Sequence, residues 1–166
     1  TVQQKLRHKE TAPKHPGEIV MKTKSVLFVI ACLYLPSLVQ ARDDHNLYSI
    51  ESAMSNWSAK GKLNKGYTFK FGDQAHGKIL ANYGEFTSNK KTNAFGKSDK
   101  EACDWVFLSA MLSFQDRITK EGGNAVINIR SYYKKNTLSS ATEFECGNGA
   151  IMAGVTFLGD VVTLEE

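Results

Sequence analysis

The sequence predicts an α+β fold, in which an antiparallel sheet carries one long helix on a face and a short N-terminal helix precedes them. One observation is a long helical segment in the middle of the chain, with a serine cap at Ser98 and a glycine pair at 122–123 behind it. The other is the alternation of apolar and polar residues on both sides of that helix, at 67–71 and at 143–146. Strands and helices in this irregular order favour a helix packed on one sheet face.

The N-terminal segment has the features of a secretory signal peptide. Met21 is followed by two lysines, by a nearly unbroken apolar run and by small residues before a cleavage site near Ala41. The run is shorter than the roughly twenty residues that a membrane-spanning helix needs. We therefore expect residues 21–41 to be cleaved, residues 1–20 to be an upstream segment, and residues 42–166 to form one periplasmic or secreted domain without a membrane span.

Lipidation of Cys32 is the alternative to this cleavage. Val29-Ile30-Ala31 resembles the small-residue pattern that precedes a lipidated cysteine. A lipid there would hold the domain on a membrane surface. Cleavage in front of Cys32 would leave apolar residues at the new N-terminus, so the sequence favours cleavage near Ala41.

The excess positive charge of the chain is confined to its N-terminal part. Residues 1–41 hold six Lys or Arg and two Asp or Glu, whereas residues 42–166 hold fifteen of each. A domain without net positive charge lacks the attraction that dominates nucleic-acid binding, so we expect no nucleic-acid partner. A composition of 42% hydrophobic and 23% charged residues is that of a folded globular domain rather than of a disordered chain.

The first elements of the mature part are a short helix and two strands. Ser49 can cap the helix, because apolar residues recur at helical spacing directly after it. Residues 67–71 alternate and place their three aromatic side chains on one face of a strand. The second strand is expected over about 78–87, where Gly84 indicates a bulge or a weak register.

The long helix should run from Ser98 to about Lys120. Ser98 and Glu101 form a capping box, and Gly122 allows a left-handed C-terminal cap. The apolar residues of the helix extend well beyond a single stripe, so a sheet or a second subunit must cover them. We expect the sheet of the same chain to do so, with a homo-oligomer as the alternative.

An antiparallel meander follows the helix. The strand over 124–133 alternates, with Ile127 and Ile129 facing opposite to Val126. A hairpin comes next, and its tight turn is expected at 147–149.

The mature part holds two cysteines, Cys103 at the start of the long helix and Cys146 on the hairpin. An even number of cysteines in an oxidising compartment favours a disulfide. The bond would close a loop of roughly 44 residues and stabilise the fold by about 4 kcal/mol in the chain-entropy model. A buried pair of free thiols and a metal or redox site are the alternatives. The sequence has no Cys-x-x-Cys motif, which argues against a thioredoxin-like role.

A heavy-metal site is the alternative function for the same cysteines. His45 and His76 could join Cys103 and Cys146 as nitrogen and sulfur ligands of a divalent heavy metal. None of the four stands at the short spacing typical of a ligand pair, and both histidines lie in polar segments. We therefore expect no cofactor and keep the metal as the alternative.

Two lysine pairs, one of them beside two tyrosines, are candidates for a surface that binds an anionic partner. In a domain without net charge this signal is weak, and solvated strand ends explain the same residues. The candidates are Lys90, Lys91, Tyr132, Tyr133, Lys134 and Lys135.

Three stretches resemble a family of small, secreted, uncharacterised proteobacterial proteins that is often labelled an excinuclease ATPase subunit. The resemblance covers roughly residues 66–162. More distantly, the helix and the strand after Gly-Gly-Asn-Ala-Val-Ile resemble small heavy-metal-binding domains and the Rcs envelope-stress lipoprotein sensor. These resemblances imply an α+β fold, oligomerisation and a role in the cell envelope, but no catalytic residues. The stretches are NKKTNAFGKS (89–98), GGNAVINI (122–129) with SYYKK (131–135), and EFEC (143–146) with GAIMAGV (149–155).

The ATPase label finds no support in the sequence. Gly96-Lys97-Ser98 matches only the end of a phosphate-binding loop, because Lys91 stands where the first glycine of that motif belongs. Capping of the long helix by Ser98 explains the same residues. We therefore predict a non-enzymatic periplasmic domain that binds an unknown protein or small ligand of the cell envelope.

Overall fold

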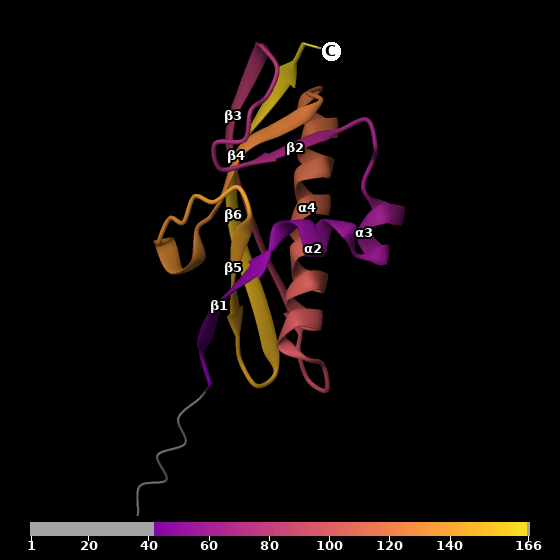
Figure 1. Cartoon of the computed structure of the whole chain (residues 1–166). Coiled ribbons are helices and arrows are strands. Elements are labelled where there is room, and N and C mark those ends of the chain that lie inside the picture. The colour runs from indigo at the N-terminus through magenta and orange to yellow at the C-terminus, as the bar shows by residue number, and fades with distance from the viewer. Residues whose placement is uncertain (1–41, 166) are drawn as a thin grey trace, which may run out of the picture. The chain divides into compact units, whose positions relative to one another are not determined.

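A computed structural model describes residues 42–165 of the chain, and within them it confirms the α+β fold (Figure 1). The expected signal peptide at 21–41, the upstream segment at 1–20 and Cys32 lie outside the described residues. Among residues 42–165, no helix is both long enough and apolar enough to cross a membrane.

The secondary structure comprises six strands, three α-helices and one 3-10 turn in the described part of the chain. In order they are β1 (Asp44–Ser49), α2 (Ile50–Ser55), α3 (Trp57–Lys62), β2 (Thr68–Phe71), β3 (Ile79–Asn93), α4 (Asp99–Glu121), β4 (Ala125–Ser131), η1 (Tyr133–Lys135), β5 (Glu143–Asn148) and β6 (Met152–Leu164).

Strand β6 organises the sheet. The strand order is β1-β5-β6-β4-β2, and β3 pairs with β6 along the other edge of that strand. Every pair is antiparallel except β2 and β4, which run parallel. The sheet is therefore mostly antiparallel, as expected, with one parallel pair that the sequence did not indicate. The reason is that β3 and α4 form a crossover between β2 and β4, which returns the chain in its original direction.

Helix α4 covers one face of the sheet, as Figure 1 shows. Phe107 and Phe114 of α4 are fully buried, and the Phe107 ring lies with its centroid 4.6 Å from that of Phe144 on β5. Phe157 on β6 completes this aromatic centre, edge-on to Phe107 at 5.7 Å. The sheet of the same chain thus covers the wide apolar surface of the helix.

Both ends of α4 have the expected caps. Ser98 Oγ accepts a hydrogen bond from the Glu101 amide at 3.2 Å, and Gly122 adopts the left-handed conformation, with φ of 79°. Ser49 caps α2 in the same way, accepting from the Ser52 amide at 3.1 Å.

Replacing Ser98 with alanine should lower the free energy of unfolding by about 1 kcal/mol, because an N-terminal amide of α4 loses its acceptor. Urea unfolding followed by circular dichroism measures the change. Ser98→Asp, which keeps an acceptor at the cap, should retain the stability of the wild-type protein. Equal stability of the alanine and wild-type proteins would show that the cap contributes nothing.

Several strands differ from the expected ones, and β4 ends at Ser131 because Tyr133 already belongs to η1. Strand β1 was not predicted, because most of its residues are exposed and show no alternation. Strand β3 continues to Asn93 instead of ending near Thr87, with its bulge at Gly84 as expected (φ 102°). The turn of the last hairpin lies at 149–151, since Gly147 still pairs with Gly154 inside the sheet.

A bulge in β4 overturns one expected alternation. Asn128 has a φ of 51°, and the register with β6 shifts between Ile127 and Arg130. This bulge turns Ile129 onto the face of Val126, where both belong to the main core beneath α4. Ile127 lies in a second apolar cluster together with Val162.

Candidate functional site

The sheet face opposite α4 carries the candidate site. Along β3 the side chains alternate between the two faces: Ser88 is buried and donates to the Ala110 carbonyl of α4 at 3.0 Å. Lys90 lies two positions after Ser88 in the strand and therefore points to the same face as Ser88. Asn89 and Lys91 point to the opposite face and are exposed. The expected lysine pair is therefore divided between two faces, and only Lys91 lies on the open one.

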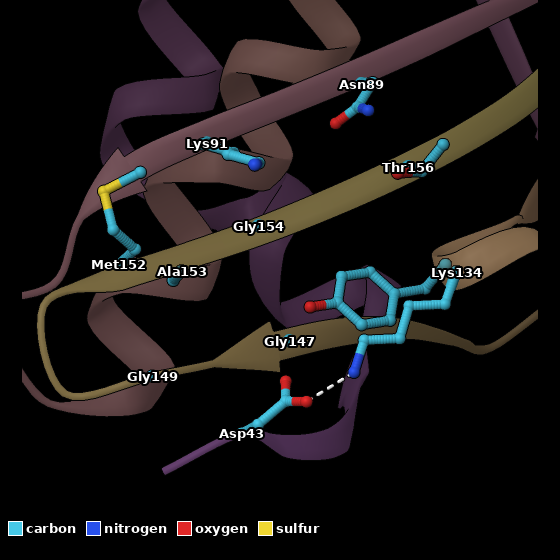
Figure 2. A pocket seen from close by; sticks show the side chains of 11 residues that line it. Asp43, Asn89, Lys91, Lys134, Gly147, Gly149, Met152, Ala153, Gly154 and Thr156 are labelled. Atoms are coloured by element: carbon cyan, nitrogen blue, oxygen red, sulfur yellow. Dashed lines mark hydrogen bonds and ion pairs between the residues drawn. The ribbon is translucent and has the colours of Figure 1, made fainter. Parts of the chain in front are cut away.

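A groove of about 430 Å³ lies on this open face, between β3, the end of β5, the start of β6 and the η1 turn. Figure 2 shows it with Lys91 and Asn89 on one side and Lys134 on the other. The sequence pairs at 90–91 and 132–135 thus meet across the strands, although Lys90, Tyr132 and Lys135 do not line the groove. Its lining residues are Asp43, Asn89, Lys91, Tyr133, Lys134, Gly147, Gly149, Met152, Ala153, Gly154 and Thr156.

The wall opposite Lys91 is the ring of Tyr133, which lies directly on the backbone of Gly147. A Cβ atom at Gly147 would stand 2.0 Å from the Tyr133 Oη atom and 2.2 Å from its Cζ atom. His45 on β1 supports the ring edge-on, with the two centroids 4.7 Å apart. Glycine at position 147 is therefore what allows the aromatic ring to lie against the sheet.

The η1 turn is fixed by an ion pair. Lys134 has a left-handed backbone with φ of 48°, and its Nζ atom donates to the carboxylate of Asp43 in front of β1. The hydrogen bond from Lys134 holds the pKa of Asp43 below its ordinary value of 3.8, and the same bond raises the pKa of Lys134. The ion pair is intact above pH 3.8 and is lost as the pH falls through the lowered pKa of Asp43. At alkaline pH it is lost only as the pH rises through the raised pKa of Lys134.

The Asp43 carboxyl carbon should therefore titrate with a midpoint below 3.8 in an NMR pH series. In Lys134→Met the midpoint should move back toward the ordinary value, although not fully, because His45 Nε2 also lies 3.5 Å from the carboxylate. An unchanged midpoint in Lys134→Met would show that the ion pair does not form in solution.

Lys91 supplies the available positive charge of the groove. Its ammonium group makes no ion pair with any residue of the 42–165 segment. Asp43, the one carboxylate among the lining residues, is already paired with Lys134. The groove as described therefore carries one positive charge in excess, next to the polar side chains of Asn89 and Thr156.

Gly154 forms the floor beneath Lys91, and packing does not require a glycine there. It lies inside β6, paired with Lys91 on one side and with Gly147 on the other. A Cβ atom at this position would meet only the Lys90 carbonyl oxygen at 3.4 Å and Lys91 Cγ at 3.5 Å, which is ordinary van der Waals contact. A glycine inside a strand costs stability and often marks the place where a ligand approaches the backbone.

Gly159, in the same strand, shows what a structural glycine looks like. A Cβ atom there would stand 2.6 Å from Val126 Cγ1 and 3.3 Å from Phe114 Cζ, both fully or almost fully buried. The core therefore excludes any side chain at Gly159, whereas Gly154 lines an open groove.

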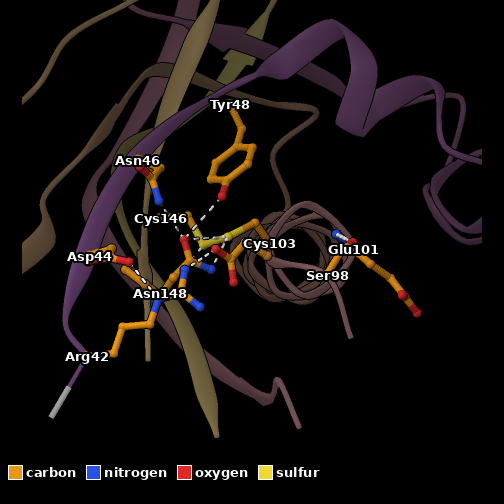
Figure 3. Close-up of polar contacts among 11 residues, drawn as sticks. Arg42, Asp44, Asn46, Tyr48, Ser98, Glu101, Cys103, Cys146 and Asn148 are labelled. Carbon is orange, nitrogen blue, oxygen red and sulfur yellow. Dashed lines mark hydrogen bonds and ion pairs between the residues drawn. A yellow bond between two sulfur atoms is a disulfide. The ribbon is translucent and has the colours of Figure 1, made fainter. Parts of the chain in front are cut away.

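Cys103 and Cys146 form the expected disulfide, which joins α4 to β5 with their Cα atoms 6.1 Å apart (Figure 3). Both cysteines are fully buried. The side-chain amide of Asn148 lies against the bond and donates to Cys103 Sγ at 3.2 Å. Tyr48 donates to Asn148 Oδ1 at 3.2 Å, and burial raises the pKa of Tyr48, so the hydroxyl keeps its proton.

The alternative metal site does not assemble from the predicted residues. Cys103 and Cys146 are bonded to each other, so neither thiol is free. His45 contacts Glu145 through Nδ1 at 3.3 Å and Asp43 through Nε2, so the two carboxylates lie at different ring nitrogens. His76 lies apart in the loop after β2, with Nδ1 2.8 Å from the Gly77 carbonyl. Residues 42–165 contain no group of three or more His, Cys, Asp or Glu side chains arranged to hold a metal ion.

The floor and the far end of the groove were not evident from the sequence. Gly154 and Thr156 lie in a segment that we interpreted only as a hairpin strand, and Asn89 in one that we placed outside any strand. The available signal was the glycine in the interior of an otherwise apolar strand.

Comparisons with known proteins add no assignment: no protein-family model, no curated protein and no solved structure matches this chain.

Proposed function

We propose that the domain is a non-enzymatic binding protein of the periplasm that holds a small anionic ligand in the groove above Gly154. The buried disulfide supports an oxidising compartment, since such bonds persist outside the cytosol. The signal-peptide pattern at 21–41 and the resemblance to a secreted family support the same placement.

One observation carries the proposal: Lys91, which has no ion-pair partner among residues 42–165, stands over a glycine that packing does not require. Lys91 would attract the negative charge of the ligand, and the amide of Asn89 and the hydroxyl of Thr156 offer hydrogen bonds beside it. The Tyr133 ring is held in place by Gly147 and His45 and offers the ligand a flat wall. Because the ring is already fixed, binding costs no conformational entropy of this side chain. A concave site with few polar groups and an apolar wall is typical of small-molecule binding.

Butyrate and its uncharged analogue butyramide form a matched pair of probes. In ¹⁵N NMR titrations, butyrate should shift the amide signals of Lys91, Gly154 and Thr156 with about millimolar affinity. Butyramide, which lacks the charge, should shift them far less. Added salt should weaken butyrate binding because it screens Lys91.

Two lysine variants test the site itself. Lys91→Met should abolish the butyrate shifts, whereas Lys90→Met, with the same change of net charge on the other sheet face, should leave them unchanged. Equal binding of butyrate and butyramide, or equal losses in both variants, would overturn the proposal.

A further inference from the structure

We infer that the ligand of the groove is amphipathic, an acidic group followed by a single aliphatic chain that lies over Met152, Ile151 and Phe95. The inference rests on the proposed function and extends it to the class of ligand. Its basis is an exposed apolar strip that begins inside the groove.

The three side chains of the strip are large apolar groups that are exposed to solvent. Phe95 is 74% exposed, Ile151 63% and Met152 45%. A folded domain that leaves such neighbouring groups in water gains nothing from them unless something covers them. Met152 lines the groove, and the pairing of Asn93 with Met152 together with the hydrogen bond from the Ala94 amide to the Ile151 carbonyl brings the backbones of the three positions to the same end of the sheet.

The strip starts beside Lys91. Met152 has the same strand parity as Gly154 and pairs with Asn93, two residues beyond Lys91 on β3. At roughly 3.3 Å per residue, the strip extends about 10 Å along the backbone from Gly154 to Ile151. A ligand whose charge is held at Lys91 therefore reaches Ile151 and Phe95 only through an extended chain.

Several backbone amides and carbonyls at this end of the domain are already hydrogen-bonded, so they are not available to a polar ligand. The Ala94 amide donates to the Ile151 carbonyl at 2.9 Å, and the Gly149 amide donates to the Met152 carbonyl at 2.8 Å. The Phe95 amide donates to Asn93 Oδ1 at 2.8 Å. Because these groups are already paired, a peptide on the strip would find few partners for its amides, whereas a hydrocarbon chain needs none.

A series of linear carboxylates tests the inference. Butyrate, hexanoate and octanoate, below their micellar concentrations, should bind about two- to fourfold more tightly for each added methylene, as expected for partial to full burial. In the double variant Phe95→Ser, Ile151→Ser, octanoate should bind no more tightly than butyrate, while butyrate itself binds as to the wild-type protein. Leu80→Ser, at the opposite end of β3 and 56% exposed in the wild type, is the matched control and should keep the gain.

The outcomes separate the two proposals. Binding of butyrate without a gain for octanoate would refute the aliphatic chain and leave the anion site intact. A gain that survives in Phe95→Ser, Ile151→Ser would also refute it, and so would tighter binding of the dipeptide N-acetyl-Leu-Leu than of octanoate. Absence of all binding would refute the proposed function itself.

Discussion

Replacing Cys103 and Cys146 together with alanine is expected to lower the free energy of unfolding by about 4 kcal/mol. The disulfide connects residues separated by 43 positions. Closing a loop of that length lowers the conformational entropy of the unfolded chain, which corresponds to a stabilisation of about 4 kcal/mol. Alanine is the suitable replacement, because a serine hydroxyl would be buried at these two fully buried positions. Such a loss is a large part of the stability of an ordinary domain.

Urea unfolding of the double variant, beside the wild-type protein with and without a reductant, measures this contribution. The reduced wild-type protein should approach the variant, and a chelator should leave the oxidised protein unchanged. Equal stability of all forms would contradict a structural role for the bond. A loss of stability caused by the chelator alone would return Cys103 and Cys146 to the metal alternative.

Gly159→Ala is expected to destabilise the fold by about 2–3 kcal/mol, the upper part of the range for overpacked cores. The added methyl group would overlap Val126 Cγ1 at 2.6 Å and press on Ile129 Cγ1 and Phe114 Cζ at 3.3 Å each. These side chains lie between β4, β6 and α4 and are at most 1% exposed, so none has space to move away.

Gly154→Ala, in the same strand, is the matched control for this substitution. It should leave the stability unchanged or raise it by up to about 1 kcal/mol, because alanine has less backbone freedom to lose than glycine. Thermal and urea unfolding of both variants give the comparison. Equal losses at the two positions would show that Gly154 is also required by packing.

The long helix could be predicted from the sequence because local signals define it. Ser98 and Gly122 mark its ends through the conformations that these residues favour, and the structure has α4 within one residue of both. The disulfide was likewise predictable, since residues 42–166 hold two cysteines, which allow one pairing.

Pairings between distant strands could not be predicted in the same way. The parallel pairing of β2 with β4 depends on how α4 crosses the sheet, and no local pattern encodes it. The bulge at Asn128 places a non-glycine residue at positive φ, so Ile129 changes faces without any signal in the hydrophobic alternation.

The candidate site was predicted in part. The lysine and tyrosine pairs indicated a surface for an anionic partner, and the structure brings Lys91, Tyr133 and Lys134 to one groove. The sequence did not show that Lys90 and Lys91 lie on opposite faces of the sheet, because the expected strand ended near Thr87. Only the observed extension of β3 to Asn93 places both lysines in a strand, where neighbouring side chains alternate between the faces. The role of Gly154 emerges only when the space above it is compared with that above Gly159.

The most direct test of the binding groove is a butyrate titration of Gly154→Val, with its stability measured in the same sample. Valine suits the interior of a strand, and its side chain would occupy the space between Lys91 and the Tyr133 wall. We predict a protein at least as stable as the wild type in which butyrate no longer shifts the amide signals of Lys91 and Thr156. Undiminished butyrate binding in the stable variant would contradict a ligand site above Gly154.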